Sequence, residues 1–157
     1  MNKDRINWFK ESVESVAGHC IVTTDTADVL KQILTDLNAQ RIATSDNPPN
    51  ARDIFGFDVG ISTAQGAIAE TGTLVLDSAC ERHRLVSLVP PVHIAIINAS
   101  SIVETLGEAL SLLQKDKEIS PAIKFITGPS RTADIELTLT IGVHGPQELY
   151  VIVDASK

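Results

Sequence analysis

Cysteine is scarce in this sequence, and its scarcity excludes several kinds of protein. The chain has 157 residues, of which only two are cysteines, Cys20 and Cys80. Two thiols cannot build a disulfide framework, and they fall short of the roughly four thiolates that hold an iron–sulfur cluster. Neither cysteine belongs to a zinc-binding spacing. We therefore expect no metal site in this chain and a reducing, cytoplasmic location.

Cations and long apolar runs are also few. Lysine and arginine number 13 against 20 acidic residues, so the formal net charge is −7. Because binding to nucleic acid or to an anionic membrane needs clustered cations, this balance argues against both partners. No apolar run approaches the roughly 18 residues that a membrane span needs, and no apolar signal region follows the charged residues 1–5. The glycine-rich phosphate motifs GxxxxGKS/T and GxGxxG do not occur.

The rest of the composition is typical of one folded domain. Hydrophobic residues make up 43% of the chain and charged residues 21%, and the mean hydropathy is +0.12. A chain of this length buries roughly 70% of its unfolded surface, which suffices for an ordinary core. We therefore expect a single globular domain.

Apolar residues at helical spacing predict three amphipathic helices. The first covers residues 6–16 and ends at Gly18, which suits a C-cap. The second covers 27–37. The third covers 102–113, and the segment Ser101–Glu104 before it matches the capping box S-x-x-E.

Short apolar runs predict seven strands. They cover residues 19–23, 41–44, 58–61, 73–76, 93–98, 125–127 and 149–153. The run 93–98 is the most apolar, which favours a central strand buried on both faces. Two further helical segments are predicted over 63–69 and 131–139, whereas 78–91 is short for a crossover helix. Strands that alternate with helices predict an α/β fold with three layers, α/β/α, around a mostly parallel sheet.

The first candidate site is the segment 69–73. It places one carboxylate, from Glu70, and two hydroxyls, from Thr71 and Thr73, around a glycine at the start of a strand. Gly72 lets a ligand or another stretch of backbone approach closely. The structural alternative is that Glu70 caps a short helix or pairs with an arginine, while the threonines bond locally.

The second candidate site is the segment 127–136, read as a strand, a Gly-Pro-Ser turn and a helix. Ligands bind at the carboxyl edge of parallel strands. Amide groups at the helix start, together with the Arg131 guanidinium, would bind a phosphate or a carboxylate. The alternative makes Ser130 an N-cap, with Asp134 complementing the helix dipole and pairing with Arg131.

Histidines and arginines in loops provide weaker candidates. His144 lies in the turn 142–146 between two glycines, where it is exposed enough to titrate or to bind an anion. A single histidine in a turn is nevertheless more often incidental. Arg84 belongs to the charged stretch 82–84 and could reach the same sheet edge as Arg131. A charged stretch of this kind usually forms a solvated loop. His93, at the end of a strand, favours a structural role.

Four stretches, taken in order, resemble the LUD domain of the lactate-utilisation protein C family. They are Gly60–Ala64 with Ile68–Thr73, Leu88–Ile94, Gly128–Glu136 and Gly142–Pro146. The resemblance is strong from about residue 56 to the end. The first 45 residues match only in the order of their elements.

The resemblance implies a fold like that of the sugar-phosphate isomerases and CoA transferases. It also implies a role in the oxidation of L-lactate to pyruvate together with iron–sulfur partner proteins, so that any cluster sits in another subunit. Family members have a longer stretch before Gly60, where this chain keeps only the proline-rich loop 45–57. Residues 1–157 are thus expected to form one LUD-type domain, shortened at this loop, whose pocket a partner or a second copy could complete.

These expectations define a pocket for a small anionic ligand or a partner surface at the sheet edge. Glu70 would act as general base or as a polar clamp, and His144 would be a candidate proton donor. The predicted ligand-binding residues are Thr71, Gly72, Thr73, Arg84, Gly128, Ser130, Arg131, Thr132 and Asp134. Two alternatives stay open: acyl transfer through Glu70, whose Glu-x-Gly segment is similar to that of the CoA transferases, and a non-catalytic scaffold or binding module.

Overall fold

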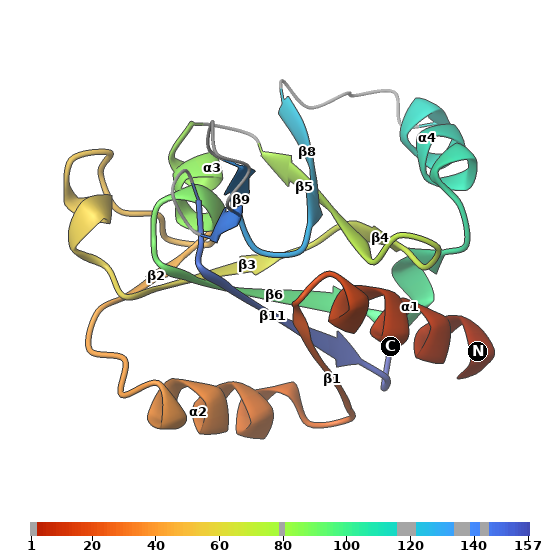
Figure 1. Cartoon of the computed structure of the whole chain (residues 1–157), viewed down its shortest axis with the longest axis horizontal. Coiled ribbons are helices and arrows are strands. Elements are labelled where there is room, and N and C mark those ends of the chain that lie inside the picture. Colours follow the sequence, from red (N-terminus) through yellow and green to blue (C-terminus); the bar gives the residue numbers. More distant parts are fainter. Residues whose placement is uncertain (1–2, 79–80, 116–121, 134–138, 142–144) are drawn as a thin grey trace.

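A five-stranded parallel sheet forms the centre of the molecule (Figure 1). The computed structural model describes residues 3–78, 81–115, 122–133, 139–141 and 145–157. In spatial order the strands are β1 (His19–Thr23), β11 (Glu148–Asp154), β6 (Val92–Asn98), β3 (Val59–Thr63) and β2 (Ile42–Thr44). The mostly parallel sheet and the central position of the most apolar strand, β6, are confirmed.

Helix α2 (Thr26–Asp36) covers one face of this sheet, as Figure 1 shows. Its buried Ile33 packs against Ile94 of β6 and Ile152 of β11. The Asp25 carboxylate accepts a hydrogen bond of 3.1 Å from the Asp28 amide and so caps the helix start. The predicted helix therefore forms where its apolar stripe can be buried.

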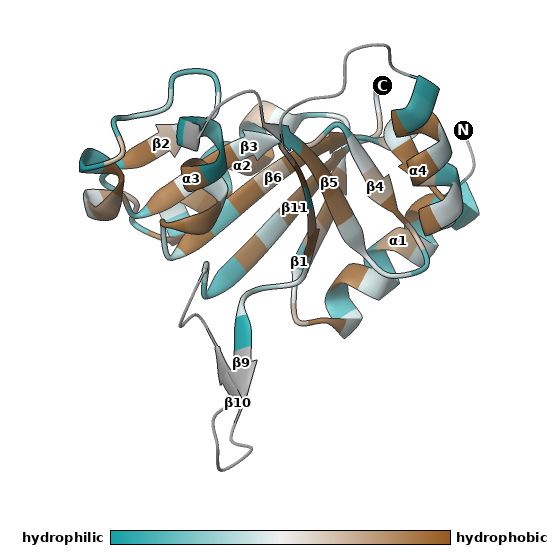
Figure 2. Cartoon of the chain, turned by 90° about the horizontal axis from the view of Figure 1, so that it is seen from above, coloured by the Kyte–Doolittle hydropathy of each residue, from teal (hydrophilic) through white to brown (hydrophobic). Residues whose placement is uncertain are grey.

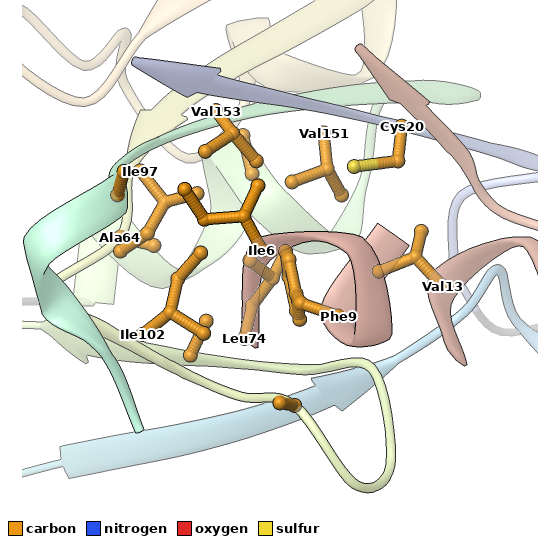
Figure 3. Packing of buried hydrophobic residues seen from close by; sticks show 14 of the residues in the cluster. Ile6, Phe9, Val13, Cys20, Ala64, Leu74, Ile97, Ile102, Val151 and Val153 are labelled. Atoms are coloured by element: carbon orange, nitrogen blue, oxygen red, sulfur yellow. The ribbon is translucent and has the colours of Figure 1, made fainter. Parts of the chain in front are cut away.

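The other face of the parallel sheet meets α1 (Lys3–Ser15), α3 (Glu81–Leu88) and a second sheet. That sheet has the order β7 (Ile102–Val103), β4 (Gly66–Ile68), β5 (Thr73–Ser78) and β8 (Ala122–Thr127). Figure 3 shows Phe9 and Val13 of α1 packed with Val151 of the parallel sheet and Leu74 of the second sheet. The α/β class is confirmed, and the second sheet is an addition that the sequence analysis did not predict.

Helix α4 (Leu106–Lys115) packs on the outer face of the second sheet through Ala109. It begins later than predicted, because residues 102 and 103 pair with β4 as strand β7. The cap is at Thr105, whose hydroxyl accepts a hydrogen bond from the Glu108 amide at 3.3 Å. The capping motif is thus Thr105–Glu108 rather than Ser101–Glu104.

Two predicted helical segments are strands instead. Residues 66–68 form β4, and the segment after Ser130 forms an antiparallel ribbon of β9 (Arg131–Ala133) and β10 (Leu139–Ile141). This ribbon is a separate two-stranded sheet, whereas Figure 2 shows β4 and β5 of the second sheet side by side. Threonine is β-branched, which favours strand over helix. Conversely, the stretch 78–91 holds helix α3, which lies over β3.

The end of α1 also differs from the prediction in detail. Ala17, not Gly18, adopts the left-handed conformation, with φ of 67°. Gly18 follows it, and its amide donates to the Val13 carbonyl at 3.0 Å. A Cβ at Gly18 would lie 2.7 Å from a Val13 methyl carbon, so glycine is needed there for close packing.

Within the described residues, none of the helices has the length and apolar character that crossing a bilayer requires.

Candidate functional site

A cavity of about 400 Å³ lies between the two sheets, and we call it the inter-sheet cavity. Its wall includes His93 of β6 and Leu149 of β11, both near the amino ends of these parallel strands. Ser87 of α3 and Thr127 of β8 also line it, and Arg131 lies on the segment that follows β8. Among the described lining residues there is no aspartate or glutamate, which favours an anion over a cation.

Three segments far apart in the sequence meet at this cavity. The Ser130 amide donates to the Pro146 carbonyl at 2.9 Å, and the Gln147 amide donates to the Pro91 carbonyl at 2.7 Å. A Cβ at Gly145 would lie 3.0 Å from the Ser130 Cβ, so the two segments are in close contact. The stretches before β6, after β8 and before β11 are thereby held together.

The same contacts correct the predicted way of binding an anion. Arg131 begins a strand, so no helix N-terminus is available at this position. The Ser130 amide is already bonded to Pro146 and has no hydrogen left for a ligand. Of the proposed anion-binding groups in this segment, the Arg131 guanidinium stays as a candidate, because its residue lines the inter-sheet cavity and is exposed.

His93 is the most unusual side chain of the cavity. Its exposed fraction is 1%, and neither Nδ1 nor Nε2 has a hydrogen-bond partner within the described residues. Burial, and to a lesser extent the positive charge of Lys124, lowers the pKa of His93 to about 3. The imidazole is therefore neutral at physiological pH.

Lys124 of β8 provides a half-buried positive charge beside the cavity. Its ammonium donates to the Arg84 carbonyl oxygen at 3.0 Å and to the hydroxyl of Ser87, which lines the cavity. Burial, followed by the positive charge of Arg84, lowers the pKa of Lys124 to about 8. Arg84, predicted as a second cation, thus contributes to the site through its carbonyl and its charge.

The predicted ligand-binding threonines bond to one another. The hydroxyls of Thr71 and Thr73 are 2.6 Å apart, and Thr73 is also 2.6 Å from the hydroxyl of Thr127 across the β5–β8 ladder. Of these three hydrogen-bonded threonines, Thr127 is the one that lines the inter-sheet cavity. The local bonding that the sequence analysis gave as an alternative is therefore present, and it connects the segment 71–73 to the cavity wall.

Gly72 packs closely against α1, and Gly128 packs closely against Val16, the residue that follows this helix. Both adopt left-handed conformations, with φ of 66° and 71°. A Cβ at Gly72 would lie 2.6 Å from the backbone of Ser12, and one at Gly128 would lie 2.5 Å from the Val16 carbonyl oxygen. The close approach predicted for Gly72 is thus made by another stretch of backbone.

Glu70 does not line the inter-sheet cavity. Its side chain is exposed, and its carboxylate accepts a hydrogen bond of 3.0 Å from the Leu106 amide at the start of α4. Its own amide donates to the Glu104 carbonyl at 3.1 Å. Glu70 therefore caps a helix, as one alternative from the sequence analysis had it. The structure does not join it to Arg131 in one pocket, and its catalytic role stays a prediction.

Replacing Glu70 separates these two roles. Glu70→Gln should lower the free energy of unfolding by about 0.5–1 kcal/mol, because a carboxylate at a helix start favours the amide groups and the dipole there. Urea denaturation measures this loss. If Glu70 is catalytic, lactate-dependent activity of a reconstituted assembly should also fall by roughly 10²–10⁴-fold. Unchanged activity together with the small stability loss would leave only the capping role.

Several predicted residues have no described side chain. His144 and Asp134 lie outside the described residues, and Thr132 is described only as part of the backbone of β9. The roles predicted for these three residues stay predictions. Of the three residues predicted to share one cavity, Arg131 lines the inter-sheet cavity together with Gly128 and Ser130, Glu70 does not line it, and His144 lies outside the described residues.

Sequence reasoning missed His93, Lys124 and Ser87. The sequence favours a structural role for His93, at the end of a strand. Side chains at every second position of a strand point to the same face, so His93 shares a face with Ala95 and Ile97. Both of those residues belong to the core cluster between the parallel sheet and the second sheet. That alternation was the available signal, but only the packing reveals that the imidazole lacks a partner.

The carboxyl edge of the parallel sheet holds a smaller cavity, of about 170 Å³. Ser45, after β2, and Thr63, at the end of β3, line it together with Asp46 and Asp77. None of the predicted site residues whose side chains the structure describes lines this cavity. The prediction that Arg131 lies at the carboxyl edge is therefore wrong, because the inter-sheet cavity is at the opposite edge.

No group of three or more histidine, cysteine or acidic side chains suited to a metal ion occurs within the described residues.

A family model describes most of this chain. The model of the LUD domain matches residues 34–153, which include the parallel sheet from β2 onward and every described residue of the inter-sheet cavity. This chain belongs to the LUD domain family. The resemblance noted in the sequence is thereby confirmed.

Curated relatives of this LUD domain chain include several named lactate utilization protein C. The chain is 41% identical over 101 residues to that of Bacillus subtilis, which covers 61% of this chain and 42% of the relative. It is 44% identical over 102 residues to lactate utilization protein C 1 of Bacillus mycoides, covering 62% and 44%. An uncharacterized protein of Neisseria meningitidis serogroup B is 34% identical over 155 residues, covering 93% and 66%.

The chain therefore spans about two fifths to two thirds of the length of these relatives.

A solved structure supports the fold of the LUD domain. A DUF162 family protein from Deinococcus radiodurans superimposes with a TM-score of 0.68 at 23% identity, covering 96% of each chain. This likeness concerns the fold alone.

Proposed function

We propose that this LUD domain chain takes part in lactate utilization and that its inter-sheet cavity binds a small carboxylate. The observation that carries the first part is the 38–44% identity to proteins named lactate utilization protein C, over roughly three fifths of this chain. The second part is supported by a cavity with Arg131 in its wall, Lys124 beside it and no described acidic lining residue. A carboxylate suits such a site, because charge-assisted hydrogen bonds are the strong ones.

Electron transfer would then belong to iron–sulfur partner proteins. The two cysteines are too few for a cluster of about four thiolates. Cys20 is buried in the core, and burial raises the pKa of its thiol to about 12, which disfavours the thiolate that metals bind. We therefore propose that this chain supplies the binding site for a carboxylate and that a cluster, where one is needed, is held by a partner.

Growth on L-lactate tests the proposed role. Deleting the gene for this chain should prevent its host from growing on L-lactate while growth on another carbon source continues. Rescue with Arg131→Gln should be impaired, since the substitution removes the guanidinium, with carboxylate affinity falling by roughly tenfold or more. Arg52→Gln, at an exposed arginine outside the cavity wall, should rescue fully. Unimpaired growth of the deletion strain on L-lactate would overturn the role.

A pull-down separates binding of a ligand from binding of a partner. Wild-type chain and Arg131→Gln should retain the same iron–sulfur partner proteins, because the substitution acts on the carboxylate. Loss of those partners in Arg131→Gln, with the carboxylate affinity unchanged, would instead assign Arg131 to a scaffold surface.

A further inference from the structure

Helix α4 leaves much of its apolar surface exposed. Ala109 is buried, and Leu113 packs beside it against the second sheet. Leu112, by contrast, is 52% exposed. Single exposed leucines are common on protein surfaces and need no explanation. Leu112 differs from them because it borders an apolar hollow.

This hollow, of about 270 Å³, adjoins α4 and the second sheet, and we call it the α4 pocket. Leu112 and Leu113 line it together with Val75 of β5 and Gly66 of β4. Its lining is mostly apolar, and no charged residue belongs to the described part of that lining. Well-packed interiors leave few voids larger than a water molecule. An apolar hollow of this size beside an exposed leucine therefore suits an apolar side chain from another molecule.

Three exposed residues of α4, Glu108, Leu112 and Lys115, form one stripe along the helix. Their spacing of four and three residues places them on the same helix face. One oxygen of the Glu108 carboxylate accepts a hydrogen bond of 3.0 Å from the Glu104 amide. Neither Glu108 nor Lys115 forms an ion pair within the described residues. The stripe is therefore negative at one end, apolar in the middle and positive at the other end.

This order of charges is complementary to itself in the antiparallel direction. When a second copy lays its stripe against this one in that direction, Leu112 meets its counterpart. Glu108 of each copy then meets Lys115 of the other copy. In the parallel direction like charges would meet instead, and they repel. A two-fold axis brings the same patch of both copies together, as such a pattern requires, so the charges favour a second copy as the partner.

We propose that two copies of this chain associate through the stripe of Glu108, Leu112 and Lys115, with Leu112 of each copy beside the α4 pocket of the other. The stripe and the α4 pocket share no residue with the inter-sheet cavity, so this inference does not depend on the proposed function. Helix α4 has 10 residues, and a pair of such helices covers less than the roughly 800 Å² per partner of a standard interface. The dimer is therefore weak, with a dissociation constant of roughly 0.1 mM.

Sedimentation equilibrium at chain concentrations from about 0.01 to 1 mM tests the apolar contact. Leu112→Gln should weaken the association by roughly tenfold or more, because the dimer loses two buried leucines. Leu110→Gln is the matched control. Leu110 is 44% exposed on the same helix but lies outside the stripe, so this variant should associate like wild type.

Exchange of the charges tests the antiparallel direction. Lys115→Glu and Glu108→Lys should each weaken the association by roughly fivefold or more, since two like-charge pairs replace two opposite pairs. Mixed in equal amounts, the two variants should associate at least as tightly as wild type. One variant then has two positive charges in its stripe and the other has two negative charges, so the mixed dimer pairs them all.

Circular dichroism checks that each variant keeps its helices. Glu108→Lys loses the hydrogen bond to the Glu104 amide, whereas Lys115→Glu changes an exposed side chain without such a contact. A wild-type chain that stays monomeric at about 1 mM would overturn the inference. Equal weakening by Leu112→Gln and Leu110→Gln, or a mixture that associates no more tightly than either charge variant alone, would overturn it as well. Carboxylate binding should be the same in Leu112→Gln and wild type, which separates this test from that of the proposed function.

Discussion

Acidification from about pH 7 to about pH 4 should destabilise the wild-type chain by about 3 kcal/mol more than it destabilises His93→Leu. The cause is the imidazole of His93, whose pKa is held at about 3 in the folded chain by burial and by Lys124. In the unfolded chain the pKa of a histidine is about 6.5. The unfolded state therefore takes up a proton at a pH at which the folded state does not.

The sign follows from that difference. Because the folded pKa lies below the unfolded one, the unfolded state binds more protons, and stability rises with pH in this range. The contribution is present above about pH 6.5 and is lost as the pH falls toward 3. Each pH unit inside this window changes the free energy of unfolding by about 1.4 kcal/mol.

Urea denaturation at a series of pH values measures the effect. The control is the exposed His19, which is stacked on Tyr150: His19→Gln also removes one histidine but leaves the buried ring of His93 in place. Carboxylates such as Asp58, whose pKa the backbone amides of Arg41 and Gln40 lower, titrate in all three proteins and cancel in the comparison. Parallel curves for wild type and His93→Leu would mean that His93 is not buried in its neutral form.

Gly72→Ala should lower the free energy of unfolding by about 3 kcal/mol or more, the second large effect that the structure predicts. Two costs add. An alanine at φ of 66° is strained, and its Cβ would lie 2.6 Å from backbone atoms of both Ser12 and Val13. Because both neighbours are backbone atoms of α1, the whole helix must move to make room.

Gly107→Ala is the matched control for this substitution. Gly107 lies in α4, and the nearest atom that a new Cβ would meet is the Thr105 hydroxyl oxygen, at 3.8 Å. Alanine favours the helix there, so this variant should gain about 0.5–1 kcal/mol. Urea denaturation of both variants checks the pair. A Gly72→Ala chain that keeps wild-type stability but loses carboxylate binding would return Gly72 to the ligand-binding role predicted from the sequence.

The long amphipathic segments could be predicted because their pattern is local. Helices α1 and α2 form where apolar residues recur at helical spacing, and strand β6 is central because its run is apolar on both faces. Two predicted helical segments were wrong. One is β4 of the 66–76 hairpin, and the other is the ribbon after Ser130. In both, pairing with a neighbouring strand outweighs a weak local preference.

Only part of the predicted site lies at the inter-sheet cavity, because contacts between distant residues also decide which side chains meet there. Gly128, Ser130 and Arg131 line the inter-sheet cavity, as their grouping in one segment suggested. Glu70 caps α4, whose first residue, Leu106, lies 36 residues further along the chain. No local sequence pattern predicts such a contact. Lys124 was not singled out, since an isolated lysine in a strand gives no signal until α3 is packed against it.

The sequence by itself determined the α/β class, the likeness to the LUD domain, the excess of negative charge and the shortage of thiols, because each depends on composition or on neighbours along the chain. Only the tertiary structure decided which edge of the sheet carries the cavity and which polar groups reach it. Burial, the loss of hydrogen-bond partners and the pKa of His93 arise from residues that fold together from distant positions. Those properties exist only once the two sheets close over the imidazole.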